Sequence, residues 1–131
     1  MTQEDKDLLL KDLCARLPYG VKVDVINEDN EHHIVKISEG NIGHLGKGFW
    51  KECKPYLFPL SSMTDEQIMN APDSIHVSDL EDIRYDSVWT KLDKRFPDLI
   101  DLIDWLNENH FDYRGLIPMD LAIDATGKNI Y

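Results

Sequence analysis

Residues 104–117, DWLNENHFDYRGLI, place several chemically active side chains close together after a helical pattern. His110, Asp112 and Arg114 are residue types that transfer protons or stabilise charge in enzymes. A working His–Asp pair also requires a nucleophile or a metal ion, and the sequence identifies neither. We therefore predict that this stretch is the packed exit of a helix, with Gly115 in a left-handed turn. An enzyme site at these residues stays open as an alternative.

The five histidines and two cysteines show no metal-binding spacing. His32 and His33 are adjacent in an expected strand, so their side chains point to opposite faces and cannot share one ion. Glu31 and His33 share a face, but a metal site requires three or four ligands. We predict no metal and no cofactor, and we expect Cys14 and Cys53 to be reduced thiols.

Residues 47–56 interleave cations with aromatic rings, a pattern that can stack bases or bind an acidic partner. The members of this lysine–aromatic patch are Lys47, Trp50, Lys51, Lys54 and Tyr56. The patch is the basis of a second hypothesis, a nucleic-acid- or nucleotide-binding module. The glycine-rich stretch at 40–49 lacks the GxxxxGK[ST] spacing of a phosphate-binding loop, so turns are the better interpretation there.

The net charge of −11 is concentrated in the second half of the chain. Residues 64–131 carry −9, from 15 acidic and 6 basic side chains. Such a field repels phosphate backbones, so we expect a protein partner rather than nucleic acid. On a helix expected at 98–109, Asp101, Asp104 and Glu108 lie opposite the apolar side. This acidic face is the candidate contact surface, and solubility is the ordinary alternative role for it.

The chain of 131 residues is long enough to bury the core of one domain. No apolar run approaches the roughly 20 residues that a membrane-spanning helix requires. The N-terminus, MTQEDKDLLL, is acidic and polar, where a signal peptide is basic and then apolar. We therefore expect a cytoplasmic protein with no membrane partner.

Local periodicity predicts a helix at each end of the chain and a hairpin after the first. Thr2 can cap a helix that continues to residue 17. Its expected apolar stripe consists of Leu9, Leu10, Leu13 and Leu17. Residues 21–26 alternate apolar and polar side chains, and residues 32–37 read as the returning strand after a turn. The two segments therefore predict an antiparallel hairpin. In the helix at 98–109, the apolar side consists of Leu99, Leu102, Ile103 and Leu106.

The remaining segments give weaker predictions. Prolines in 55–60 favour an edge strand, and 74–77 reads as a short strand. Capping boxes at Thr64 and Ser78 predict helices after each, the second extending over much of 79–96. Alternation in 119–124 predicts a last strand.

These elements do not alternate strictly, so the fold class that we predict is α+β rather than doubly wound α/β. We expect a single small domain over residues 1–131, with an antiparallel, hairpin-based sheet packed by the N-terminal and C-terminal helices. Within it, residues 18–63 form a β-rich part and residues 64–131 an acidic helical part.

Three blocks of the sequence, somewhat under half of the chain, support a family resemblance. The blocks are LLLKDLCARLPYGVKV (8–23), KPYLFPLSSMTDEQ (54–67) and IDWLNENHFDYRGLIPMDLAIDATG (103–127). Together they resemble a family of small uncharacterised proteins encoded by phages, prophages and mobile elements of gut bacteria. Members of that family often have a basic residue at the position of Phe58 and a glycine at the position of Asp120. The resemblance implies an origin, and it implies no activity or catalytic residue.

The combined prediction is a non-enzymatic, phage- or mobile-element-derived domain that binds a protein. In this hypothesis the acidic face binds a host protein. Its spaced carboxylates mimic the charges that nucleic acid presents to a basic partner.

Overall fold

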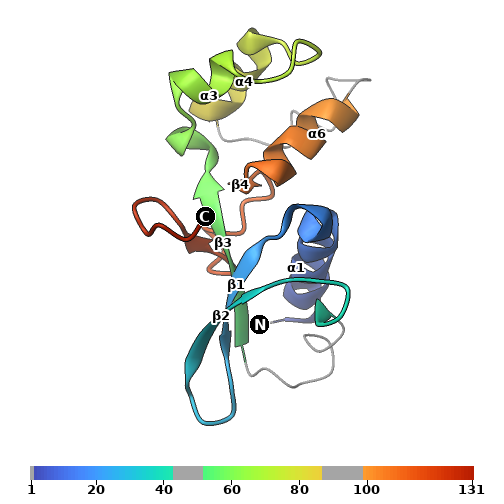
Figure 1. The fold of residues 1–131 in the computed structure, drawn as a ribbon, viewed down its shortest axis with the longest axis vertical. Helices are drawn as coiled ribbons and strands as arrows, with labels where there is room; N and C mark the ends of the chain where they lie inside the picture. The colour runs from blue at the N-terminus through green and yellow to red at the C-terminus, as the bar shows by residue number, and fades with distance from the viewer. Residues whose placement is uncertain (1, 43–51, 87–98) are drawn as a thin grey trace.

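The computed structural model describes residues 2–42, 52–86 and 99–131, and Figure 1 shows their arrangement. The first elements are α1 (Gln3–Arg16), the 3-10 turn η1 (Leu17–Tyr19), β1 (Lys22–Ile26), β2 (His32–Lys36) and β3 (Glu52–Pro59). They are followed by η2 (Leu60–Ser62), α3 (Asp65–Met69), α4 (Val77–Asp86), α6 (Leu99–Glu108), β4 (Phe111–Asp112) and β5 (Ile123–Asp124). Helices and a mixed sheet in one small chain confirm the α+β class.

The first helix begins and ends where its sequence predicts. The Thr2 side chain accepts from the Asp5 N–H, and the Asp5 carboxylate accepts from the Thr2 N–H, which completes a capping box. Pro18 lies in η1, and Gly20 turns the chain toward β1 with φ +66°. Glycine adopts this left-handed conformation without the steric cost of a Cβ atom.

The buried face of α1 differs from the expected leucine stripe. Leu10 is 43% exposed, so its place in the stripe was wrong. The buried positions are Leu9, Asp12, Leu13 and Arg16, which follow the i, i+3, i+4, i+7 spacing of one helix face. Leu10 lies about 100° around the helix from Leu9 and therefore points away from that face.

The sheet has the strand order β2-β1-β3-β4, with β5 pairing to β3. β1 and β2 form the predicted antiparallel hairpin, in which Val25 is opposite His33. Val21, Val23 and Val25 are fully buried, which confirms the alternation read from the sequence.

β3 was predicted as an edge strand, and the structure corrects this. It pairs antiparallel with β1 along 52–55, then parallel with β5 and β4 along 56–59. Proline has no N–H to donate to a neighbouring strand. The prolines are compatible with this pairing because the hydrogen bonds on the β4 and β5 side use backbone groups of other residues. The Phe58 N–H donates to the carbonyl of His110, and the Leu57 carbonyl accepts from Ala125.

Between β3 and α6, one predicted helix start is confirmed and the next is wrong. Thr64 caps α3 through a capping box with Gln67. The next helix begins at Val77, so neither the strand at 74–77 nor the cap at Ser78 is observed. A tight turn, in which the Ile75 N–H donates to the Pro72 carbonyl, occupies the place of that strand. Of the segment 79–96, residues after 86 lie outside the described part of the chain.

The last predicted strand, 119–124, is shortened to Ile123–Asp124. Asp120 has φ +59°, and its N–H donates to the carbonyl of Ile117. This turn breaks the alternation and leaves Met119 47% exposed.

The buried side chains form two clusters, one at the sheet and one among the helices. Figure 1 shows the β1–β2 hairpin and the helices α3 and α4 toward opposite ends of the molecule. The sheet core packs α1 against the sheet and contains Leu9, Leu13, Val21, Val23, Val25, Ile37, Cys53, Leu57, Leu116, Leu121 and Ala122. The helical core lies among α3, α4 and α6 and contains Leu60, Met63, Ile68, Ile75, Leu80, Ile83, Leu102, Trp105, Leu106, Phe111 and Tyr113. Residues 111–125 lead from the helices back to the sheet, so both cores include side chains from the last third of the chain.

Candidate functional site

The exit of α6 is a left-handed turn at a histidine. His110 has φ +62°, and its N–H donates to the carbonyl of Asn107. The aromatic residues of the exit are buried as expected, because Trp105, Phe111 and Tyr113 are 7%, 1% and 4% exposed. The sequence predicted a left-handed residue only at Gly115, which has φ +74°. Glycine is the usual residue for such a turn, so the second one at His110 had no signal.

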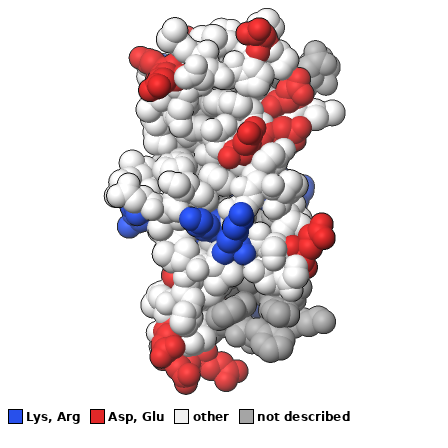
Figure 2. All heavy atoms as spheres, in the orientation of Figure 1, with Lys and Arg blue, Asp and Glu red and all other residues white. Residues whose placement is uncertain are grey.

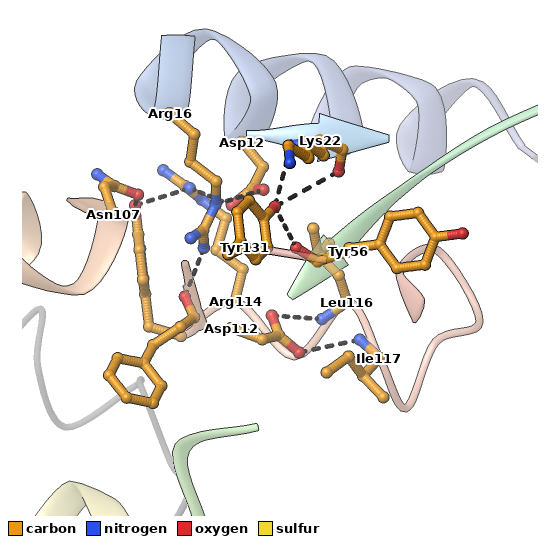
Figure 3. A network of polar contacts seen from close by, with 12 residues as sticks. Asp12, Arg16, Lys22, Tyr56, Asn107, Asp112, Arg114, Leu116, Ile117 and Tyr131 are labelled. Carbon is orange, nitrogen blue, oxygen red and sulfur yellow. Dashed lines mark hydrogen bonds and ion pairs between the residues drawn. The ribbon is translucent and has the colours of Figure 1, made fainter. Parts of the chain in front are cut away.

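Asp112 is a structural residue of this exit. One carboxylate oxygen accepts from the N–H of Leu116 at 2.9 Å, and the other accepts from the N–H of Ile117 at 2.9 Å (Figure 3). The residue is 6% exposed. Both oxygens are therefore used in closing the turn around Gly115, and neither is directed to His110.

The Arg114 side chain points to α1 and contacts a group of polar side chains there. We call this group the arginine cluster, and its members are Asp12, Arg16, Tyr113 and Arg114. The Asp12 carboxylate accepts from Arg16 Nε at 2.9 Å and from Arg114 Nη1 at 2.8 Å. Arg16 Nη2 also donates to the carbonyl of Phe111 at 2.6 Å (Figure 3). Two cations thus share one fully buried carboxylate.

Aromatic and amide groups complete the arginine cluster. The Tyr113 hydroxyl donates to Asn107 Oδ1 at 3.0 Å and accepts from Arg114 Nη1 at 2.9 Å. The Tyr113 ring centroid lies 5.2 Å from the Arg16 guanidinium carbon and 4.7 Å from that of Arg114. These contacts fix the planes of both guanidinium groups. Arg16 Nη1 is buried and has no hydrogen-bond partner among the described residues.

Sequence reasoning missed Asp12 and Arg16. The signal was their spacing: with Leu9 and Leu13 they fill one helix face at i, i+3, i+4 and i+7. A charged pair at apolar positions of an otherwise buried face indicates a buried ion pair.

His110 is poorly suited to general base catalysis. Its ring stacks on Tyr131 with centroids 3.7 Å apart, and Nδ1 is buried with no hydrogen-bond partner in the described chain. Burial, followed by the positive charges of Arg16 and Lys22, lowers its pKa from 6.5 to about 4. A base of that pKa binds protons weakly at neutral pH. His110, Asp112 and Arg114 therefore make separate structural contacts and do not converge on a common reacting position.

The lysine–aromatic patch is only partly visible. Lys47, Trp50 and Lys51 lie outside the described residues. Lys54 forms ion pairs with Glu52 at 3.2 Å and with Asp120 at 3.0 Å. Tyr56 is 9% exposed. The two described members are thus a paired cation and a buried ring, and they present no open stacking surface.

The predicted acidic face is present on α6. Asp101, Asp104 and Glu108 are all exposed. Figure 2 shows acidic side chains over α6, over the α3 and α4 end and at the β1–β2 turn, while basic side chains lie across the middle. Across residues 2–42, 52–86 and 99–131, no lysine or arginine forms an ion pair with these three carboxylates.

An open groove of about 610 Å³ lies beside the acidic face. Its walls come from η1 and from the residues that follow β2, and Glu108 of α6 reaches its rim. Tyr19 lines it, and its pKa is raised by burial and then by the negative charges of Asp104 and Glu108. Glu108 therefore belongs both to the groove and to the acidic face.

The described part of the chain contains no group of three or more potential metal ligands. His32 instead pairs with Asp24 at 2.9 Å, and His33 lies 3.6 Å from the Glu31 carboxylate. Cys14 and Cys53 are free thiols. Burial, followed by the charge of Asp24, raises the pKa of Cys53 to about 12.

Comparison of this chain with protein-family models, with curated proteins and with solved structures found no match. Among the described residues, no helix is both long enough and apolar enough to cross a membrane.

Proposed function

We propose that this protein is a non-enzymatic interaction domain of phage or mobile-element origin whose acidic face binds a basic host protein in the cytoplasm. The observation that carries the proposal is a contrast between two kinds of acid. The buried carboxylates Asp12 and Asp112 have all their oxygens hydrogen-bonded, whereas Asp101, Asp104 and Glu108 are exposed and have no cationic partner in the described chain.

The acidic face has a local energetic cost that a basic partner would relieve. Asp101 and Asp104 are three residues apart, and Asp104 and Glu108 are four apart, so their charges repel across one helix face. Glu108 also ends α6, where the helix dipole disfavours negative charge, and no basic residue stands in the last turn. A lysine- or arginine-rich surface would neutralise all three.

Two further observations support the binding proposal over the other hypotheses. The groups of His110, Asp112 and Arg114 are used in structural contacts, which leaves the enzyme hypothesis without a reacting centre. The described members of the lysine–aromatic patch offer no open stacking surface, which weakens the nucleic-acid hypothesis. The three blocks of family resemblance support the phage or mobile-element origin.

Fluorescence anisotropy with a labelled peptide of nine lysines tests the acidic face. The triple variant Asp101→Asn, Asp104→Asn, Glu108→Gln removes three charges while keeping the side-chain shapes. We expect it to weaken binding about tenfold or more, since each exposed pair contributes up to ~1 kcal/mol and tenfold is about 1.4 kcal/mol.

The matched control removes three charges elsewhere. Glu66→Gln, Asp73→Asn and Glu81→Gln change exposed carboxylates on α3, on α4 and in the loop between them rather than on α6. We expect less than about a threefold loss for this variant. Equal losses in both variants would mean that only net charge matters, and absence of binding by the unmodified protein would overturn the proposal.

A further inference from the structure

The groove beside the acidic face combines an apolar floor, an aromatic ring and carboxylates. Leu17 and Pro18 contribute apolar surface, and Tyr19 contributes a phenol ring. Glu39 lines the groove from the chain after β2, and Glu108 lines it from α6. The volume of about 610 Å³ exceeds that of a single long side chain, so a side chain and its flanking backbone fit within it.

The shape of the groove depends on Gly20. A Cβ atom there would lie 2.5 Å from Lys36 Cε, so the absence of a side chain lets Lys36 lie across the turn. The Ile37 N–H donates to the Val21 carbonyl at 2.9 Å, which joins the two walls below this point. Lys36 therefore places a cation of the protein itself along one wall of the groove.

The chemistry of these groups matches one side chain best. An arginine stem is apolar and can lie along Leu17 and Pro18, while its planar guanidinium can stack on a phenol ring and pair with carboxylates. A lysine ammonium pairs with carboxylates but is more strongly hydrated and cannot make the planar, forked contact. Of the charged groups that face the groove, Glu39, Glu108 and the nearby Asp104 outnumber Lys36.

We infer that this groove binds an arginine side chain of the basic partner, with Tyr19 as the stacking platform and Glu39 and Glu108 as the anionic rim. The inference rests on the proposed function, because the acidic face supplies the general attraction and the groove supplies selectivity for arginine.

Two labelled peptides of equal charge test the inference by fluorescence anisotropy, one alternating arginine and glycine and one alternating lysine and glycine. The unmodified protein is expected to bind the arginine peptide at least about fivefold more tightly. Tyr19→Leu keeps an apolar side chain but removes the ring, and Glu39→Gln removes an exposed charge. Each is expected to reduce the affinity for the arginine peptide about fivefold and that for the lysine peptide less than about twofold.

Two further variants control the experiment. Glu28→Gln removes an exposed charge at the β1–β2 turn and is expected to change neither affinity by more than about twofold. Lys36→Met removes the competing cation and is expected to raise the affinity for the arginine peptide about threefold. Thermal melting of each variant verifies that it is folded, and Glu39→Gln tests the site even if Tyr19→Leu unfolds.

The outcomes separate the two proposals. If both peptides bind equally and neither groove variant changes this, while the triple variant of α6 weakens both, the groove inference is overturned and the acidic face stands. If the arginine peptide requires Tyr19, Glu39 and Glu108 but is unaffected by the double variant Asp101→Asn, Asp104→Asn, which keeps the groove rim, the groove stands and the wider acidic face fails. Failure of both peptides to bind overturns both.

Discussion

The sheet core and the helical core are stabilised in different ways. In the sheet core, β1, β2 and β3 are joined by continuous backbone ladders, and α1 covers the resulting apolar face. In the helical core, α3 has 5 residues, and the described parts of α4 and α6 have 10 residues each. Their buried side chains pack together with Trp105 and Phe111, whose rings stack, and such packing supplies most of the stability of helices in proteins. The sheet core is thus organised by the backbone and the helical core by side chains.

The arginine cluster lies where the two cores meet, and it connects them through charge. Asp12 and Arg16 belong to α1, while Tyr113 and Arg114 follow β4 and belong to the returning chain. A buried ion pair contributes little net stability compared with apolar packing, but it fixes geometry because each partner must be matched. We therefore expect the cluster to fix the position of α1 relative to the exit of α6.

The largest expected effect is the loss of Asp12. Asp12→Ala leaves Arg16 and Arg114 without their shared carboxylate, and we expect the free energy of unfolding to fall by about 3–5 kcal/mol. Urea denaturation followed by circular dichroism measures it. The matched control is Asp65→Asn, which removes the charge of an exposed carboxylate, 87% exposed, that pairs with Arg84 in the helical part. That change should cost less than about 1 kcal/mol, and equal costs would contradict the role of burial.

The next effect compares the two cores directly. Leu13→Ala in the sheet core and Leu106→Ala in the helical core remove side chains that are 1% and 0% exposed. Each should cost about 2–5 kcal/mol in urea denaturation. Ile100→Ala on α6 is the control, because Ile100 is 75% exposed and should change stability by less than about 0.5 kcal/mol. A small effect at Leu106 would show that the helical core is not a packed unit.

A smaller effect is expected at Gly115. No atom lies within 4 Å of a Cβ added there, so Gly115→Val tests backbone strain at φ +74° without a clash. We expect a cost of about 1–3 kcal/mol. Gly40→Val is the control, since Gly40 lacks the positive φ and an added Cβ meets only Ser38 Oγ at 3.7 Å. Similar stability of the two variants would refute the account of the exit turn.

The smallest effect is the pH dependence from His110, which lies between the cores. Its pKa is about 4 in the folded protein and 6.5 when exposed, so the unfolded chain binds the proton more readily. Its stabilising contribution is complete above pH 6.5 and is lost as the pH falls toward 4. Allowing for partial exposure, we expect a loss of about 1–2 kcal/mol.

The His110→Gln variant isolates this contribution, because the carboxylates that also titrate in this range are common to both proteins. Urea denaturation at pH 7 and at pH 4.5 should show a smaller loss of stability for the variant. The same loss in both proteins would mean that His110 is protonated equally in the folded and unfolded states.

The sequence by itself determined the elements whose signals are local. The capping box at Thr2, the alternation in 21–26 and the burial of Leu102 and Leu106 on α6 each depend on residues close together in the sequence. The predicted burial of the Leu99 side chain lies outside the described part of the structure. The exposure of Asp101, Asp104 and Glu108 was also determined locally, because it follows from the helical period. So was the left-handed turn at Gly115.

Only the tertiary structure decided the pairing of β3, the partners of Arg16 and Arg114, and the groove beside Tyr19. Arg16 reaches a carbonyl 95 residues away, and Arg114 reaches a carboxylate 102 residues away. Periodicity reports which face of an element is apolar, but it contains no information about which distant segment will cover that face. The prolines of β3 illustrate the limit, because they exclude certain hydrogen bonds and leave open which neighbours supply the others.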